Sequence, residues 1–193
     1  MHTEPPRYGV VNARNCGMIA RDGTWLATDI WRPAHDGEPL PGPFPAILLR
    51  TPYDRARSSS QDLCEFFASN GYLAAIQDCR GRYQSEGKFM LLPNEGADGY
   101  DAIEWVASLP YCDSNVGTYG TSNLAWVQNA AAIECPPHLK AMWVNQGGAN
   151  GNTSSLRHNG ALELRWLTWA VTFGTVSREA QQEPALQEKL TRA

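Results

Sequence analysis

The sequence predicts an α/β protein with a mostly parallel, doubly wound sheet and a β-hairpin at its amino-terminal end. Three observations indicate this fold class. An Asp-Gly turn at residues 22–23 separates two short strand-like segments. Apolar runs then alternate with helix-compatible segments, and a Gly-x-Ser turn joins one of these runs directly to a helix.

The elements follow from turn signals and from the period of the apolar residues. The expected strands are 15–20, 24–31, 46–50, 72–77, 115–119 and 139–145, and the expected helices are 61–70, 94–109 and 123–133. Continuous apolar runs such as 46–50 are typical of strands buried on both faces of a sheet. We expect the serines at 58–60 to cap the first helix and Gly71 to end it. Residues 32–45 are rich in proline and glycine and are expected to form a loop.

The composition changes after Gly148. Residues 150–159 are expected to form a polar loop, and 161–173 to form a helix that carries Trp166 and Trp169. Apolar residues lie nearly all round this helix, so we expect other chain segments to cover it.

Composition narrows the class of function. The 193 residues are 42% hydrophobic with a net charge of −4, which suits one soluble globular domain and offers no basic surface for nucleic acid. No apolar run is long enough to cross a bilayer and the first residues lack a secretory pattern, so we expect a cytoplasmic protein. The five cysteines form no Cys-x-x-Cys pair and no cofactor motif is present, so we expect neither a metal site nor a cofactor.

Ser122 is the candidate nucleophile. The run from Val116 to Tyr119 meets Gly120, one spacer and then the serine, and a helix-compatible stretch starts at Asn123. In a nucleophile elbow this layout exposes the serine Oγ at the apex of a tight strand-to-helix turn, where the preceding glycine avoids a clash. Gly-x-Ser also occurs in ordinary turns, so the pattern alone leaves both interpretations open. A phosphate loop fits poorly, because the Walker lysine and the three-glycine dinucleotide spacing are absent.

A serine nucleophile needs a histidine base that is oriented by a carboxylate. In an α/β-hydrolase both groups follow the serine, yet Asp113 is the last aspartate here and only His138 and His158 come later. His138 precedes a strand that is expected to run parallel to the strand before Ser122, which places it at the opposite end of the sheet. His158 lies on the side of the serine, but we expect it in a solvated loop or lid.

Two groups can form an oxyanion hole beside Ser122. One is the backbone N–H of Asn123, the residue after the serine. The other is the hydroxyl group of Tyr53, in the loop that follows the strand 46–50, where Pro52 stiffens the backbone. The alternative for Tyr53 is a half-buried aromatic residue with no part in catalysis.

Seven segments between residues 21 and 166 together match, in order and spacing, the pattern of one protein family. They are Arg21-Asp-Gly-Thr-Trp-Leu-Ala-Thr-Asp-Ile-Trp-Arg-Pro33, Arg50-Thr-Pro-Tyr-Asp54, Gln77-Asp-Cys-Arg-Gly-Arg82, Ser85-Glu-Gly87, Glu95-Gly-Ala-Asp-Gly-Tyr-Asp-Ala-Ile-Glu-Trp105, Val116-Gly-Thr-Tyr-Gly-Thr-Ser122 and His158-Asn-Gly-Ala-Leu-Glu-Leu-Arg-Trp166. Together they resemble the cocaine esterase / X-Pro dipeptidyl-peptidase group of α/β-hydrolases. The resemblance implies an α/β-hydrolase fold, with 1–149 as the amino-terminal part of the core and 150–193 as the incomplete start of a helical cap.

The same resemblance implies a serine hydrolase that cleaves esters or amides, Xaa-Pro peptides included, through an acyl-enzyme on Ser122. Tyr53 and Asn123 match the oxyanion donors. Trp166 and Trp169 are candidates for lining an acyl pocket, with burial in the cap as the alternative. The expected partners are a small ester or amide or a short peptide, with no nucleic acid and no membrane, and self-association is left open.

The resemblance also implies that Asp78, Arg80 and Gly81 have a structural role and fix loops around the site. The elbow departs from the family pattern Gly-x-Ser-Tyr-x-Gly, since Asn123 and Ala125 replace its Tyr and second Gly. The backbone donor survives, while the added methyl group of Ala125 costs about 1–3 kcal/mol if the packing cannot relax.

A larger departure from the family is the missing triad acid and base. In the family both lie after the cap, so we expect this chain to be an amino-terminal part of a longer hydrolase, with weak or absent turnover by itself. The alternative is a catalytically inactive, hydrolase-derived interaction domain.

Overall fold

A computed structural model describes residues 6–91, 93–148, 150 and 156–192. The strands are β1 (Gly9–Ala13), β2 (Met18–Ile19), β3 (Trp25–Leu26), β4 (Thr28–His35), β5 (Glu38–Pro39), β6 (Phe44–Thr51), β7 (Leu73–Asp78), β8 (Cys112–Thr121), β9 (Leu139–Asn145), β10 (Arg157–His158) and β11 (Ala161–Leu162). The helices are α1 (Ser58–Ser69), α2 (Glu95–Ala107), α3 (Asn123–Ile133), α4 (Leu164–Gly174), α5 (Arg178–Gln182) and α6 (Pro184–Arg192).

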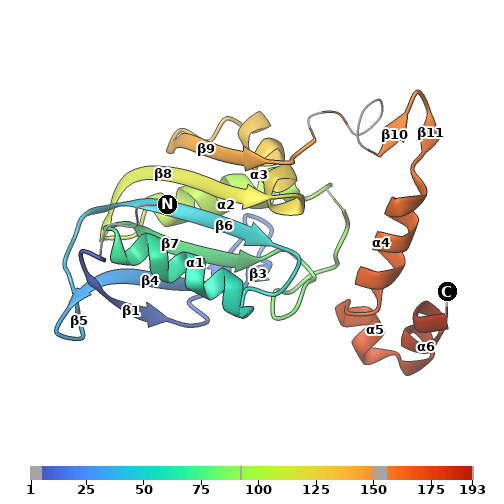
Figure 1. The fold of residues 1–193 in the computed structure, drawn as a ribbon, viewed down its shortest axis with the longest axis horizontal. Coiled ribbons are helices and arrows are strands. Elements are labelled where there is room, and N and C mark those ends of the chain that lie inside the picture. Colours follow the sequence, from blue (N-terminus) through green and yellow to red (C-terminus); the bar gives the residue numbers. More distant parts are fainter. Residues whose placement is uncertain (1–5, 92, 149, 151–155, 193) are drawn as a thin grey trace.

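A mixed sheet forms the centre of the molecule (Figure 1). Within the described residues it has seven strands in the order β1-β4-β7-β6-β8-β9, with β5 paired to β4. Strands β6, β7, β8 and β9 are parallel, whereas β4 is antiparallel to both β1 and β7. The predicted mostly parallel α/β fold is therefore confirmed, and the carboxyl ends of the parallel strands meet at one edge of the sheet.

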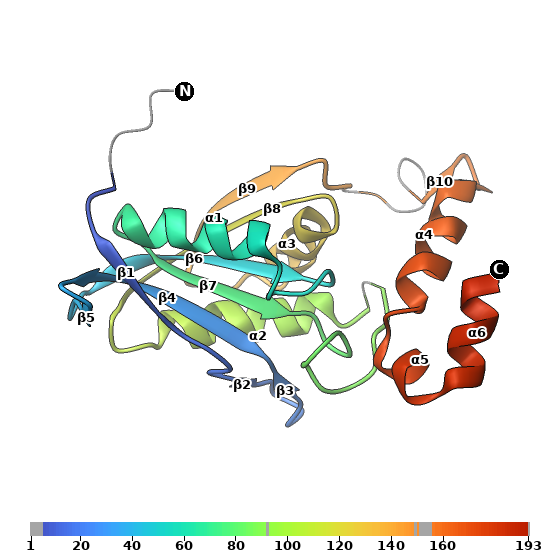
Figure 2. The same ribbon diagram turned by 60° about the horizontal axis from the view of Figure 1, so that its bottom comes forward.

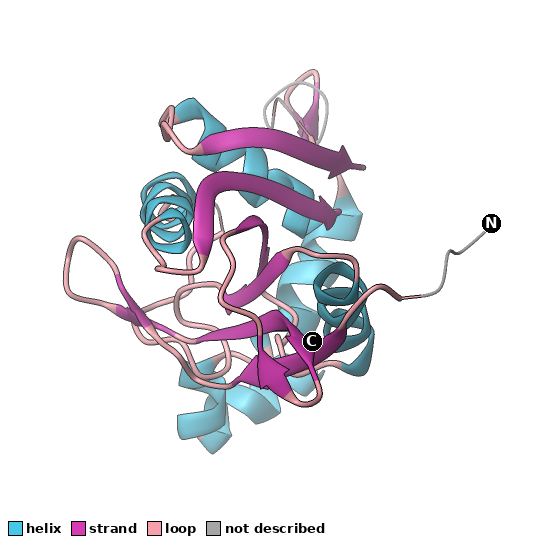
Figure 3. Ribbon diagram, turned by 90° about the vertical axis from the view of Figure 1, so that its left-hand side faces the viewer, coloured by secondary structure: helices cyan, strands magenta, loops and turns pink. Residues whose placement is uncertain are grey.

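Helices cover both faces of the sheet (Figures 2 and 3). Successive strand residues point to opposite faces, and Leu48 and Leu49 on β6 accordingly belong to different core clusters. Leu49 packs in the cluster of α1, which contributes Ala68. Leu48 packs in the cluster of α2, which contributes Ile103. Strand β6 is thus buried between helices on both faces of the sheet, as predicted for the apolar run 46–50.

The amino-terminal elements differ from the prediction. The hairpin is shorter, with Met18–Ile19 paired to Trp25–Leu26, and β4 leaves it to join the main sheet. Strand β1 was not predicted, and the expected loop 32–45 contains the end of β4, all of β5 and the start of β6. The proline content favoured a loop, but Pro39 lies on a short strand at the edge of the sheet, where proline is tolerated.

The predicted cap of α1 is also wrong. The N-cap is Arg57, and no side chain forms a cap hydrogen bond there. The other end agrees with the prediction, because Gly71 follows the C-cap with a φ of 92°, in the left-handed region that suits glycine.

Helices α4, α5 and α6 lie beside the sheet edge at which the parallel strands end (Figures 1 and 2). Helix α4 has no buried residue, and Leu164 and Leu167 on it are exposed. The predicted loop 150–159 lies partly outside the described residues, and its end forms β10, which pairs with β11. No helix in the described ranges is long and apolar enough to span a membrane.

Candidate active site

Ser122 lies at the turn between β8 and α3. Its backbone has a φ of 61° and a ψ of −120°, an uncommon conformation for a residue with a side chain. The turn is held by a hydrogen bond from the Ser122 N–H to the Asn145 carbonyl at 3.0 Å. The structure therefore places Ser122 at the crest of the strand-to-helix turn that the sequence predicts. Strain of this kind is stored where the surrounding structure requires it, and it occurs frequently at functional sites.

Two glycines make the turn sterically feasible. A Cβ atom on Gly120 would lie 2.3 Å from the Leu124 Cβ and 2.9 Å from the Leu124 backbone. A Cβ atom on Gly147 would lie 2.7 Å from the Cβ of Ala125, which is fully buried. Gly147 thus leaves room for the methyl group that Ala125 adds to the elbow, so the packing accommodates this departure from the family pattern.

Replacing Gly120 by alanine is expected to lower the free energy of unfolding by about 3 kcal/mol, because the new methyl group overlaps the first turn of α3. The matched control is Gly174→Ala, since a Cβ atom there makes an ordinary contact of 3.4 Å with the Leu190 Cδ1. We expect the control to change stability by less than about 1 kcal/mol. Urea unfolding of both variants measures the difference, and equal midpoints would contradict the packing described here.

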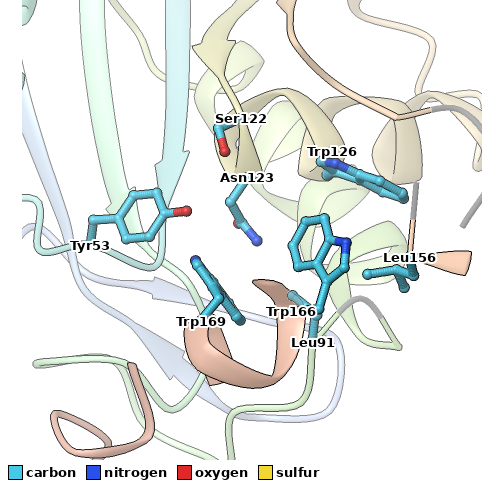
Figure 4. Close-up of a pocket in the computed structure, with 8 residues that line it drawn as sticks. All are labelled: Tyr53, Leu91, Ser122, Asn123, Trp126, Leu156, Trp166 and Trp169. Atoms are coloured by element: carbon cyan, nitrogen blue, oxygen red, sulfur yellow. The ribbon is translucent and has the colours of Figure 1, made fainter. Parts of the chain in front are cut away.

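A pocket opens beside Ser122 (Figure 4). Its lining residues come from the loop after β6, the segment before α2, the elbow, α3, the segment before β10 and α4, and none of their side chains is charged. They are Tyr53, Leu91, Ser122, Asn123, Trp126, Leu156, Trp166 and Trp169. Half of these residues are aromatic. A second, open hollow continues from the pocket past Gln146 and Gly148 and includes Arg165.

Tyr53 and Asn123 border the serine. The hydroxyl group of Tyr53 points toward the side chains of Ser122 and Asn123 (Figure 4). Its backbone N–H donates to the Thr51 Oγ1 at 3.0 Å, and its ring packs on Phe173 with centroids 5.0 Å apart. Asn123 begins α3, and the N–H groups of a first helical turn have no partner within the helix. These positions suit two donors for one developing oxyanion.

The structure brings together all five residues that the sequence singles out: Ser122, Tyr53, Asn123, Trp166 and Trp169. Sequence reasoning missed Trp126, although a signal for it exists. Trp126 follows Ser122 by four residues, which is one helical turn, so it lies over the same end of α3. Leu91 and Leu156 gave no such signal, since both lie in irregular segments far along the chain from the elbow.

Neither later histidine lines the pocket in the part of the chain that the structure describes. His138 precedes β9, which runs parallel to β8, so it lies at the opposite end of the sheet as predicted. There its Nδ1 lies 2.7 Å from the Glu104 Oε2. His158 lies on β10, with its Nε2 2.5 Å from the Glu163 Oε1.

The turn after β7 connects the site to its surroundings. Buried Asp78 accepts hydrogen bonds from the Arg55 N–H at 2.8 Å and from the Arg55 Nη1 at 2.6 Å. Burial raises the pKa of Asp78 to about 6, while these hydrogen bonds favour its charged form. Asp78 therefore holds the loop 52–57, which carries Tyr53.

Arg80 and Gly81 extend the same turn. Arg80 forms ion pairs with Asp98 at the start of α2 and with Asp22 in the hairpin, at 2.6 and 2.7 Å. Gly81 has a φ of 68°, and a Cβ atom on it would lie 2.1 Å from the Phe89 N. The contacts agree with the structural role that the resemblance implies for these two residues.

Comparisons with known proteins identify relatives of most of the chain. A family model described as X-Pro dipeptidyl-peptidase (S15 family) matches residues 22–193. The cocaine esterase of Rhodococcus sp. (strain MB1 Bresler) is 35% identical over 169 residues, which are 84% of this chain and 29% of that protein.

Solved structures agree with this relationship. A CocE/NonD family hydrolase from Staphylococcus aureus superposes with a TM-score of 0.75 and 25% identity, over 90% of this chain and 36% of that one. An alpha-amino acid ester hydrolase superposes with a TM-score of 0.58 and 26% identity, over 74% of this chain and 26% of that one. The chain thus spans only 26–36% of the length of these relatives.

Proposed function

Because this chain belongs to the X-Pro dipeptidyl-peptidase (S15) family of hydrolases, we propose that it carries the nucleophile and the oxyanion donors of a serine hydrolase. The observation that carries the proposal is the position of Ser122, at a strained turn that faces a pocket and the Tyr53 hydroxyl. Such a turn presents the serine Oγ to a bound carbonyl group.

The reaction proceeds in two steps. The Ser122 Oγ bonds to the carbonyl carbon of an ester or amide and gives up its proton to a base, and the carbonyl oxygen becomes an oxyanion. The Tyr53 hydroxyl and the Asn123 N–H donate hydrogen bonds to that oxyanion. The alcohol or amine then leaves with the proton, and water hydrolyses the acyl group from Ser122.

We place the base and its carboxylate outside residues 1–193. Both histidines that follow Ser122 pair with glutamates and do not line the pocket in the described chain. The matched segment is 29% of the cocaine esterase, so the relatives have ample further sequence for these groups. Activity of the 193 residues alone is therefore expected to be weak or absent.

A fluorophosphonate probe tests the proposal, because it bonds covalently to an activated serine. Two proteins are compared: the full product of the gene, here called the protein expressed from its own gene, and residues 1–193 alone. We expect the first to carry one probe molecule on Ser122, located by peptide mass spectrometry, and the second to be labelled slowly. Equal rates in both proteins would place the base within the chain, with His158 as the candidate. No labelling of Ser122 in either protein would contradict the assignment of the nucleophile.

The substrate class follows from the uncharged lining of the pocket. An apolar or aromatic acyl group suits Trp126, Trp166 and Trp169, whereas a free α-ammonium group finds no carboxylate among the described lining residues. Burying that charge unpaired is costly, so we expect kcat/KM for 4-nitrophenyl benzoate to exceed that for Ala-Pro-4-nitroanilide by at least about 100-fold. Benzoyl-4-nitroanilide, which has the same leaving group as the dipeptide substrate, controls for leaving-group chemistry. A preference for the dipeptide would contradict this substrate assignment.

A second candidate function is that of an inactive interaction domain. Within the described chain β9 is the last strand of the sheet and pairs only with β8. Trp143 and Val144 on β9 are exposed, which is unusual for a strand of a parallel sheet. Size-exclusion chromatography with light scattering separates the candidates, because a discrete dimer that lacks probe labelling at Ser122 would favour the interaction domain.

A further inference from the structure

We propose that Arg82 is a positioning residue, which couples helix α4 of the pocket wall to the oxyanion donor Tyr53. The inference rests on the function proposed for Tyr53 and adds a residue that acts through it. Arg82 is only 1% exposed. Its Nε donates to the Pro52 carbonyl at 3.0 Å, and its Nη1 donates to the Phe173 carbonyl at 2.9 Å. One planar guanidinium thus joins the Tyr53 loop to helix α4, and Arg82 itself is 91 residues from Phe173 in the chain.

The contact with Pro52 fixes the start of the Tyr53 loop. The Pro52 carbonyl belongs to the peptide group that leads into Tyr53, and the ring of Pro52 restricts its own φ. On the other side of Tyr53, Arg55 is held by Asp78 through two hydrogen bonds. Tyr53 therefore lies between two anchored residues, and the direction of its hydroxyl group depends on both anchors.

The contact with Phe173 fixes the end of α4. The Phe173 carbonyl is one of the last four of the helix, which lack intrahelical donors, and a cation there is favourable for the helix dipole. Helix α4 also carries Trp166 and Trp169, and the Phe173 ring lies between Trp169 and Tyr53, with centroids at 4.9 and 5.0 Å. A displacement of α4 by a bound acyl group is therefore transmitted to Tyr53.

The chemistry of Arg82 suits this role better than a role in surface charge pairing. No carboxylate lies within ion-pair distance of it among the described residues, and the guanidinium contacts two backbone carbonyls and the faces of Tyr83 and Phe89. Burial lowers the pKa of its guanidinium, which nevertheless stays charged at neutral pH because arginine titrates far above that range. Two rigidly spaced N–H groups hold two peptide groups at a fixed separation.

Arg178 provides the matched control. Its Nη1 donates to the Ser85 carbonyl at 2.8 Å, so it also connects the segment after α4 to the turn after β7. This hydrogen bond does not involve the Tyr53 loop, and Arg178 does not line the pocket beside Ser122. Loss of the Arg178 side chain therefore weakens the connection between these two segments without removing a hydrogen bond to the Tyr53 loop.

A double-mutant cycle of Arg82→Gln and Tyr53→Phe tests the coupling in the protein expressed from its own gene, with 4-nitrophenyl benzoate as substrate. Arg82→Gln alone is expected to lower kcat by roughly 10-fold or more through misplacement of the donor. In the Tyr53→Phe background it is expected to lower kcat by less than about 2-fold, since the hydroxyl it positions is absent. Arg82→Lys recovers part of the loss, and Arg178→Gln leaves kcat unchanged.

The outcomes separate the coupling from the proposed function. If the effects of Arg82→Gln and Tyr53→Phe on kcat multiply in the double variant, Arg82 is merely structural and the coupling is wrong. If Tyr53→Phe has no effect on kcat, the oxyanion role of Tyr53 fails, and the coupling fails with it. Should Arg82→Gln not fold, Arg82→Lys takes its place in the cycle, and multiplicative effects would again overturn the coupling.

Discussion

Replacing Ser122 by alanine is expected to lower kcat for 4-nitrophenyl benzoate by about 10⁴-fold or more in the protein expressed from its own gene. The variant keeps the turn and the pocket, because the methylene carbon of the side chain remains, but no atom is left to bond to the acyl carbon. Residual hydrolysis reflects binding and the oxyanion donors alone. Initial rates, with active sites titrated by the fluorophosphonate probe in the parent protein, measure the loss.

Ser69→Ala is the matched control for this prediction. Ser69 ends α1, where its hydroxyl group donates only to the Phe66 carbonyl at 3.0 Å. We expect parental activity in this variant. If Ser122→Ala retained more than a tenth of the parental kcat, another residue would have to form the bond to the substrate, and the role assigned to Ser122 would be wrong.

Replacing Tyr53 by phenylalanine is expected to lower kcat by about 10²–10³-fold, with little change in KM. The ring and its packing on Phe173 are retained, and only the hydroxyl group that points toward the elbow is removed (Figure 4). A donor that binds the oxyanion more tightly than the ground-state carbonyl affects kcat and kcat/KM equally. Steady-state kinetics over a range of substrate concentrations separates the two parameters.

Tyr72→Phe removes a hydroxyl group at the opposite end of the parallel strands, directly before β7, and is expected to leave both parameters unchanged. A rise in KM at constant kcat for Tyr53→Phe would instead show that Tyr53 contributes uniform binding. That result would remove it from the oxyanion hole and leave it as part of the pocket wall.

The sequence predicts the parts of this fold that local patterns determine. Helix α3 and strand β9 have the predicted bounds. The turn at Gly120 marks the start of the helix, and Pro136 and Pro137 come shortly before the strand. Strands β1 and β5 were missed, since short strands at a sheet edge depend on their partner rather than on a local apolar run. The side-chain cap of α1 was wrong for a related reason, since three serines in a row satisfy the pattern but the chain turns into the helix at Arg57.

The candidate site was predictable to the extent that topology fixes it. Ser122 and the Tyr53 loop follow parallel strands, β8 and β6, whose carboxyl ends share one edge of the sheet, so sequence order alone brings them together. The contribution of Arg82 was not predictable. Its partner Phe173 is distant in the chain, and a hydrogen bond to a backbone carbonyl requires no particular side chain at the acceptor, so the sequence carries no pattern for it.

The most direct test of the account is to trap the acyl-enzyme. The protein expressed from its own gene is mixed with 4-nitrophenyl benzoate and quenched in acid within the first turnovers, and peptide mass spectrometry then locates the benzoyl group. We predict one benzoyl group per molecule, on the Oγ of Ser122, in step with a burst of 4-nitrophenol. Release of 4-nitrophenol with the benzoyl group on another residue, or with no adduct while Ser122→Ala stays active, would contradict the central claim.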